Sequence, residues 1–360
     1  MNFESLQQIL LAGIKNNASD LHLRTNEKPL FRIRGELTPI KMDPITPTQM
    51  KSLCEAISRV SSKPFKMEEI SDLDGAFEIP NVCRIRYNIF RYLSQYGIIM
   101  RIINTNIKTI EDLGLPEIIR SVALKRQGLI LVTGATGTGK SSTLAAMIHE
   151  INKQTASHIL TLEDPIEFIH KPMKSRISQR EIGSDCPDFI LGLKSALRQD
   201  PDVILIGEMR DASTMDIALK AAETGHVVFA TMHTTNALTT IGRLISMFPA
   251  DEQNNVRDRL GDNLTATIGQ RLLNSKNDNK RVAALEVMVT GPGIKDCIKG
   301  KEDLTSIYNY IERGFKEMQS MSFDQYITHL YNNGHVTFEE AKLNASSPEN
   351  FERNIMFNDV

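Results

Sequence analysis

Residues 134–141 read Gly-Ala-Thr-Gly-Thr-Gly-Lys-Ser, which matches the spacing Gly-x-x-x-x-Gly-Lys-Ser of a phosphate-binding loop. A short apolar segment, residues 129–133, precedes the loop, and a helical stretch, residues 142–151, follows it. The glycines let the backbone curl until its N–H groups face phosphate oxygens, and the helix adds its positive N-terminal end. This context predicts a nucleotide-phosphate site rather than a glycine-rich turn with an exposed lysine.

The polar residues of this loop have expected tasks. Lys140 is expected to reach the β- and γ-phosphates, and Ser141 to place its hydroxyl on Mg²⁺, whereas Thr143 is expected to be an ordinary helix residue. The predicted ligands are therefore ATP and Mg²⁺. The residues predicted to bind the nucleotide are Gly134, Ala135, Thr136, Gly137, Thr138, Gly139, Lys140, Ser141, Ser142 and, further along the chain, His233.

A carboxylate follows a second predicted strand, residues 203–206. That strand runs into Gly207 and Glu208, the position at which P-loop ATPases hold the acid of the Walker B motif. Many such enzymes place an Mg²⁺-binding Asp there, but this sequence has Gly207, so Glu208 is predicted to position the attacking water and act as the base. The alternative is an acid that only favours the N-terminal end of a helix.

Three more carboxylates gather after a third predicted strand, residues 158–162, in the run Glu-Asp-Pro-Ile-Glu at residues 163–167. Buried together they would raise one another's pKa unless a cation or a hydrogen-bonding water shared the site, so Mg²⁺ and the attacking water are reasonable partners. Glu163 is the predicted catalytic member. Asp164 is equally consistent with capping the turn before the proline, and Glu167 with a solvated surface position.

Two histidines flank a fourth predicted strand, residues 227–232. An imidazole at the edge that holds the phosphate loop can hydrogen-bond a phosphate oxygen and sense its presence, which is the role predicted for His233. The alternative for His233 is a structural residue with its hydrogen bonds satisfied. For His226, which precedes the strand, a phosphate-sensing role and a structural role are equally consistent with the sequence.

Short β-branched strands alternate with helical stretches from residue 128 onward, which predicts an α/β fold with a mostly parallel sheet and ligands at the C-terminal strand ends. Residues 1–105 mix a helix with strand-like segments and predict a smaller α+β domain. Residues 106–116 are predicted to be a linker, and residues 117–360 the main domain, which ends in a helical tail beyond about residue 293.

The composition limits the partners. Of the 360 residues, 42 are Lys or Arg and 44 are Asp or Glu, and there is no Trp, so no nucleic-acid partner is expected and a DNA-processing motor is disfavoured. The four cysteines form no Cys-x-x-Cys pair, which argues against a zinc site or a disulfide framework. Without a secretory leader or a long apolar run, a cytoplasmic protein with at most peripheral membrane contact, made through partners, is expected.

The motifs together resemble the secretion-ATPase superfamily. In the order of that superfamily, residues 134–141 correspond to its Walker A motif, 160–167 to its Asp box, 202–211 to Walker B and 222–233 to its His box. Within it the chain is similar to the PilT-type retraction ATPases of type IV pili over nearly its whole length. Further stretches that carry this similarity are residues 19–23, 197–202, 221–226 and 346–350.

The resemblance implies a PAS-like N-terminal domain joined to a RecA-like P-loop ATPase domain. It also implies a homohexamer with ATP sites shared between neighbouring subunits, bound at the cytoplasmic face of the inner membrane to a pilus platform protein. Arginines of the N-terminal domain are expected to swing onto the γ-phosphate, where a guanidinium neutralises transition-state charge. The corresponding part of this chain carries Arg84, Arg86 and Arg101, of which Arg86 and Arg101 are the predicted residues. The alternative is that they are basic residues on a solvated sheet face.

One segment departs from the retraction ATPases. They commonly carry Ala-Ile-Arg-Asn-Leu-Ile-Arg-Glu, whereas residues 293–300 read Gly-Ile-Lys-Asp-Cys-Ile-Lys-Gly. The predicted function is an ATP-hydrolysing motor for pilus retraction and twitching motility. The alternatives are an ATPase of a related secretion or conjugation apparatus, and a nucleotide-gated regulatory module with little turnover.

Overall fold

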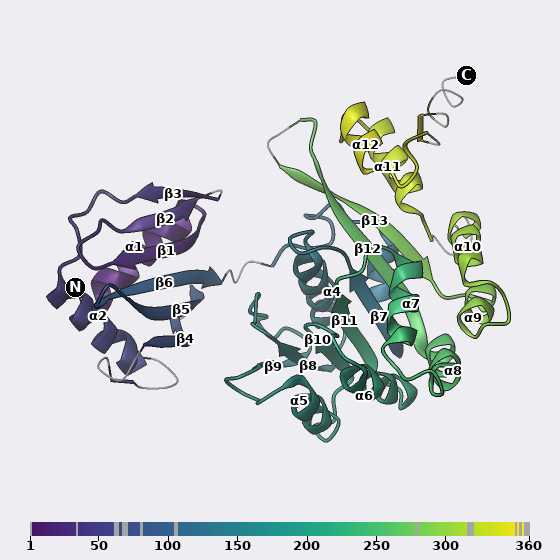
Figure 1. Cartoon of the computed structure of the whole chain (residues 1–360), viewed down its shortest axis with the longest axis horizontal. Coiled ribbons are helices and arrows are strands. Elements are labelled where there is room, and N and C mark those ends of the chain that lie inside the picture. The colour runs from purple at the N-terminus through teal and green to yellow at the C-terminus, as the bar shows by residue number, and fades with distance from the viewer. Residues whose placement is uncertain are drawn as a thin grey trace. The chain divides into compact units, whose positions relative to one another are not determined.

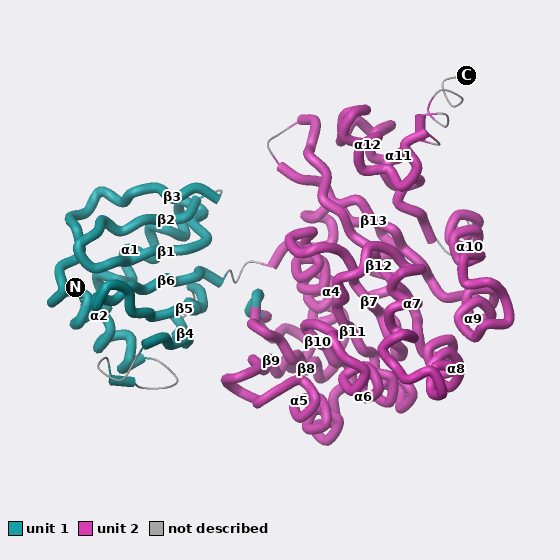
Figure 2. Tube along the Cα trace, viewed as in Figure 1, with its two compact units in different colours: residues 1–106, 167–169 teal, residues 107–166, 170–360 magenta. Residues whose placement is uncertain are grey.

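The computed structural model describes residues 2–33, 35–60, 65–66, 71–79, 82–103, 107–277, 280–314, 320–349, 351–352 and 355. The chain forms two compact units, drawn in different colours in Figure 2. Unit 1 contains residues 1–106 and 167–169, and unit 2 contains residues 107–166 and 170–360. Residues 107–116, which the sequence assigns to the linker, contribute the buried side chains of Ile110 and Leu115 to unit 2.

Unit 1 is an antiparallel sheet with the strand order β3-β2-β1-β6-β5-β4, and its described residues also form the helices α1 and α2. Strand β5 alternates in burial: the side chain of Ile85 is buried in the apolar core, and the next residue, Arg86, lies on the other face. The elements are α1 (Phe3–Lys15), β1 (Ala18–Arg24), β2 (Leu30–Ile33), β3 (Glu36–Pro39), α2 (Pro47–Val60), β4 (Asp72–Ile79), β5 (Cys83–Tyr92) and β6 (Gln95–Ile103).

Unit 2 begins with a parallel α/β arrangement and ends in a series of short helices. Its first elements are α3 (Ile118–Ala123), β7 (Gly128–Thr133), α4 (Lys140–Gln154), β8 (His158–Glu163), β9 (Arg176–Glu181), α5 (Phe189–Ala196), β10 (Val203–Ile206), α6 (Ala212–Glu223), β11 (Val227–Met232) and α7 (Ala237–Ser246). These are followed by α8 (Gln253–Asn263), β12 (Leu264–Asn274), β13 (Arg281–Val289), α9 (Pro292–Ile298), the 3₁₀ turn Leu304–Ser306, α10 (Ile307–Arg313), α11 (Phe323–Asn332) and α12 (Phe338–Asn344).

The sheet of unit 2 has the order β13-β12-β7-β11-β10-β8-β9, and it is parallel except for the antiparallel pair β12–β13 (Figure 1). Strands β7, β10 and β11 are buried along their whole length, as expected when both faces of a parallel sheet are covered. Alternate residues enter two separate apolar clusters, for example Ile130 on one face and Leu131 on the other. The carboxyl ends of β7, β11, β10 and β8 therefore meet at one edge.

The predicted fold class is confirmed: the chain is a mixed α/β protein with a largely parallel sheet and a smaller α+β unit before it. The helical tail expected beyond residue 293 corresponds to α9 and the helices that follow it. Among the described residues, no helix combines the length and the apolar character needed to cross a lipid bilayer.

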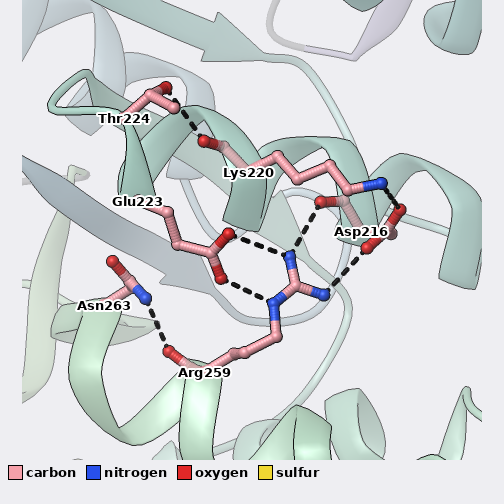
Figure 3. Close-up of polar contacts among 6 residues, drawn as sticks. All are labelled: Asp216, Lys220, Glu223, Thr224, Arg259 and Asn263. Carbon is pink, nitrogen blue, oxygen red and sulfur yellow. Dashed lines mark hydrogen bonds and ion pairs between the residues drawn. The ribbon is translucent and has the colours of Figure 1, made fainter.

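Helices α6 and α8 are joined by a polar network centred on Arg259 (Figure 3). The Arg259 guanidinium donates from Nη1 to Asp216 Oδ1 at 2.8 Å and from Nε to Glu223 Oε1 at 2.5 Å. Lys220 adds a bond to Asp216, at 2.7 Å. The guanidinium and its two carboxylate partners are partly shielded from water, since 21–33% of the side chain is exposed in Arg259, Asp216 and Glu223. This geometry is among those in which an ion-pair network contributes measurably to stability.

Replacing Arg259 with Ala should lower stability by about 2 kcal/mol, because two carboxylates lose their shared partner. This corresponds to a fall in the apparent melting temperature of roughly 4–8 °C. The matched variant Arg259→Lys keeps the charge but not the planar fork, and should recover at most half of the loss. A thermal unfolding scan in which Arg259→Ala melts with the native protein would contradict this role.

Candidate active site

The phosphate loop adopts a conformation that depends on its glycines. After β7 ends, Gly134, Gly137 and Gly139 have φ angles of +146°, +81° and +89°, a region that side chains with a Cβ disfavour. A Cβ on Gly134 would also lie 2.5 Å from the carbonyl oxygen of Gln270. Helix α4 starts at Lys140, and no side chain of the described residues caps its first turn from the N-cap position, Gly139. The first N–H groups of α4 are thus available to an anion.

Lys140 is held across this loop. Its side chain is 8% exposed, and Nζ donates to the carbonyl oxygens of Gly134 and Ala135, at 2.9 Å each. Phosphate oxygens carry more charge than carbonyl oxygens and would compete for the same ammonium protons. Ser141, the next residue, is half-buried in the first turn of α4. The predicted phosphate-binding residues therefore share one compact loop with the lysine directed into it.

Gln270, on β12, supports the loop from behind and was not identified from the sequence. Its side chain is 3% exposed; Nε2 donates to the carbonyl oxygen of Thr138 at 2.8 Å, and Oε1 accepts from the Thr143 hydroxyl at 2.8 Å. One amide thus joins the loop to the first turn of α4, and Thr143 is more than the ordinary helix residue that we expected. A Cβ on Gly139 would lie 2.9 Å from Gln270 Nε2, which explains the glycine there.

Glu208 lies just beyond β10, with His233 and Arg210 on its carboxylate. Oε2 accepts from Arg210 Nη2 at 2.6 Å, and Oε1 lies 3.2 Å from His233 Nε2. The hydrogen bond from Arg210, aided by the nearby His233, holds the pKa of Glu208 below its usual range although partial burial opposes this. The structure therefore brings two predicted site residues together as an ionised carboxylate and an imidazole. Arg210 was missing from the sequence-based prediction.

Glu163 ends β8, the strand beside β10. Its Oε1 accepts from the Thr161 hydroxyl at 2.6 Å and from Gln179 Nε2 at 3.1 Å, two partners that the sequence did not reveal. Gly207, which precedes Glu208, lies against the end of β8: its N–H donates to the Leu162 carbonyl oxygen at 2.7 Å, and a Cβ there would lie 3.2 Å from Glu163 Cα. A side chain in place of Gly207 would therefore be in tight contact with the backbone of β8.

Arg86 and Arg101 belong to unit 1, where they are directly opposed on β5 and β6. Arg101 Nε donates to Asp20 Oδ1 at 2.9 Å; this carboxylate is buried, while 67% of the arginine side chain is exposed. Asp20 faces Arg32 on its other side, at 3.9 Å. The two arginines thus lie side by side on a polar face of the sheet of unit 1. Their action at the phosphate site stays a prediction.

The residues of unit 2 that were predicted from four separate segments are placed at the ends of four neighbouring parallel strands. A curled glycine loop with an inward lysine, an uncapped helix start and two carboxylates at the adjoining strand ends are features of a P-loop nucleotide-binding protein of the α/β class. A model of the family described as "Type II/IV secretion system protein" matches residues 3–348. The chain belongs to that family.

Individual relatives give the closer comparison. The chain is 40% identical to the type IV pilus retraction ATPase PilT of Pseudomonas aeruginosa over 346 residues, which cover 96% of this chain and 99% of the relative. It is 39% identical to a twitching motility protein of Neisseria gonorrhoeae over 322 residues, covering 89% and 85% of the two chains.

Solved structures agree with these relatives. The crystal structure of the pilus retraction motor PilT with bound ADP has a TM-score of 0.87 at 36% identity, covering 98% of this chain and 99% of that one. The ATPase DotB of Legionella pneumophila has a TM-score of 0.78 at 27% identity, covering 95% of each chain.

Replacing Gln270 with Leu should weaken nucleotide binding about tenfold or more, because the Thr138 carbonyl and the Thr143 hydroxyl lose their buried partner at about 1–3 kcal/mol each. Thr143→Val, which removes one of the two bonds, should have a smaller effect. Fluorescence anisotropy with a labelled ADP measures both.

Thr267→Val is the matched control, since this hydroxyl is buried on the same strand without a hydrogen-bond partner among the described residues. It should bind ADP as the native chain does. Equal affinity of Gln270→Leu and Thr267→Val would show that the amide does not shape the loop.

Proposed function

We propose that this protein hydrolyses ATP with Mg²⁺ and uses the energy to drive type IV pilus retraction, and hence twitching motility. The observation that supports the chemistry best is that Glu208 and Glu163 lie at the ends of two adjacent strands, β10 and β8. These ends belong to the sheet edge that also holds the phosphate loop. The similarity to retraction ATPases over 96% of the chain supports the biological role.

The residues of the loop fit a magnesium nucleotide. No cluster of three or more His, Cys, Asp or Glu side chains in the described part of the chain could hold a metal by itself. The Ser141 hydroxyl would therefore hold Mg²⁺ together with phosphate oxygens and water, which is how P-loop proteins use this position. When bound, Mg²⁺ neutralises charge on the phosphates.

The side chains around the loop divide the work of hydrolysis. Lys140 exchanges the Gly134 and Ala135 carbonyl oxygens for phosphate oxygens and so positions the γ-phosphoryl group. Glu208, kept ionised by Arg210, accepts a proton of the attacking water while Glu163 orients that water from the neighbouring strand. As the new P–O bond forms, the bond to the β-phosphate oxygen breaks. Because this chemistry is mostly positioning and charge stabilisation, no covalent intermediate is needed.

The assembly and location follow from the same proposal. The chain works as a homohexamer in which Arg86 and Arg101 complete the phosphate site. It acts in the cytoplasm, at the cytoplasmic face of the inner membrane, on a platform protein at the base of the pilus. Hydrolysis changes the arrangement of the two units and thereby removes subunits from the pilus.

An ATPase of a related secretion or conjugation apparatus is the second candidate. Two observations favour it: the description of the matching family as "Type II/IV secretion system protein" and the departure of residues 293–300 from the retraction motif. In α9, Ile294 and Cys297 keep the buried apolar spacing, while Lys295 and Lys299 lie 3.8 and 2.8 Å from carboxylate oxygens of Asp262 on α8. These lysines stand where the motif has arginines, so this surface carries ammonium groups in place of planar guanidinium groups.

Glu208→Gln should bind ATP with native affinity and hydrolyse it at least about 100-fold more slowly, since the water loses its base. Phosphate release at saturating ATP measures this. Glu339→Gln, a change on the exposed side of the tail helix α12, is the control and should turn over normally. Native turnover in Glu208→Gln would overturn the assignment, and negligible turnover by the unmodified ring would favour a regulatory module.

Deletion of the gene should abolish twitching while pili persist on the surface, because retraction fails but assembly does not. Electron microscopy of surface pili and a stab assay for twitching give the two readouts. Normal twitching together with a loss of protein secretion or conjugation would replace pilus retraction with the second candidate.

A further inference from the structure

The segment that carries His233 is tied to the start of α7. Thr234 and Thr240 share a hydroxyl–hydroxyl hydrogen bond of 2.6 Å, and the Thr240 hydroxyl also donates to the Asn236 carbonyl oxygen at 2.6 Å. Asn236 caps the helix by accepting from the Thr239 N–H at 2.8 Å, in a capping box. The segment from His233 to the first turn of α7, called the His233 piece below, is therefore joined by hydrogen bonds that begin at the residue after His233.

Glu286 connects this piece to the sheet. It lies on β13 with 2% of its surface exposed, and its Oε1 accepts from the backbone N–H of Ala237, the first residue of α7, at 2.6 Å. Asn236 satisfies a different donor, the N–H of Thr239, so the two side chains complement each other at the helix start. A carboxylate also interacts favourably with the positive end of the helix.

The strand beside β13 supports the phosphate loop. Glu286 is paired in register with Gly269 on β12, and the next residue, Gln270, makes the bonds to Thr138 and Thr143. A side chain in place of Gly269 would meet the Phe323 ring at 3.1 Å and the Glu286 Cβ at 3.5 Å. One antiparallel hairpin, β12–β13, thus holds the phosphate loop through Gln270 and the His233 piece through Glu286.

We propose that Glu286 is a positioning residue of the ATPase site. By accepting a hydrogen bond from the Ala237 N–H, it fixes the position of α7 relative to the phosphate loop. This in turn fixes the His233 imidazole in its contact with Glu208. The inference rests on the proposed ATPase activity and deepens it. Glu286 itself touches neither nucleotide nor water in this role. It acts through the 3.2 Å contact between His233 and Glu208.

A purely stabilising role fits the site less well. Burial raises the pKa of Glu286 to about 7, against the opposing influences of the Ala237 hydrogen bond and of Arg271 on β12; Asp324 on α11 also raises it. Because the folded pKa lies above the unfolded one, the stability contribution is complete below about pH 4.5 and is lost as the pH rises through 7. An ionised Glu286 therefore costs stability, and a neutral residue would be preferred if stability were its task.

Three variants separate the possibilities. Glu286→Leu removes the acceptor at similar volume, Glu286→Gln keeps an oxygen that can accept from the Ala237 N–H, and Val287→Ala removes buried volume from the same strand without touching α7. The measurements on the full chain are kcat and KM for ATP, the melting temperature, and the ¹H–¹³C signal of the His233 imidazole, assigned by its loss in His233→Gln.

Glu286→Leu should lower kcat about tenfold or more, leave KM for ATP within twofold and shift the His233 signal. Glu286→Gln should keep most of kcat, and Val287→Ala should lower the melting temperature but keep kcat within twofold. A native kcat and an unmoved His233 signal in Glu286→Leu would overturn the proposal, and so would Glu286→Gln failing as completely as Glu286→Leu. If the unmodified protein shows no turnover, the proposed function fails, while the His233 signal still decides the role of Glu286.

Discussion

The parallel alignment of β7, β11, β10 and β8 is the constraint on which the site depends, because it brings the carboxyl ends of four strands to one edge. Each strand is followed at that edge by a residue or loop that is predicted to take part in nucleotide binding or hydrolysis. Just after β10 the backbone runs close to β8, since a Cβ on Gly207 would lie 3.2 Å from Glu163 Cα. The hydroxyl of Thr231 also donates to the Gly207 carbonyl oxygen at 2.5 Å, which fastens the ends of β11 and β10 to each other.

The antiparallel hairpin β12–β13 supplies a second level of support. The hairpin contributes no residue to the phosphate loop itself. However, Gln270 hydrogen-bonds to the loop, and Glu286 hydrogen-bonds to the start of α7. Both side chains are almost completely buried, so their hydrogen bonds are shielded from competition by water. The reacting groups are therefore positioned by a frame of backbone pairing and not by loops alone, which is the arrangement that electrostatic catalysis requires.

Much of this site could be predicted from the sequence, because Lys140, Ser141, Glu163, Glu208 and His233 each follow a short β-branched strand at a recognisable spacing. Two of the residues that were missed, Gln270 and Glu286, act at long range in the sequence. Gln270 lies 127 residues from Thr143, and Glu286 lies 49 residues from Ala237; neither belongs to a local pattern, since their roles depend on strand register. Arg210 lies two residues after the predicted residue Glu208, but its bond to that carboxylate depends on the direction of the chain after β10. The sequence predicted the parallel sheet but not the antiparallel pair β12–β13.

The central claim is that one edge of the sheet of unit 2 binds ATP and activates water. An experimental structure of the protein with Mg²⁺, ADP and a planar fluoride analogue of the γ-phosphoryl group tests it most directly. We expect Lys140 Nζ to have left the Gly134 and Ala135 carbonyl oxygens for phosphate oxygens, Ser141 to bind the metal, and a water in line with the analogue to donate to Glu208. A nucleotide bound elsewhere, or an in-line water held without Glu208, would contradict the account.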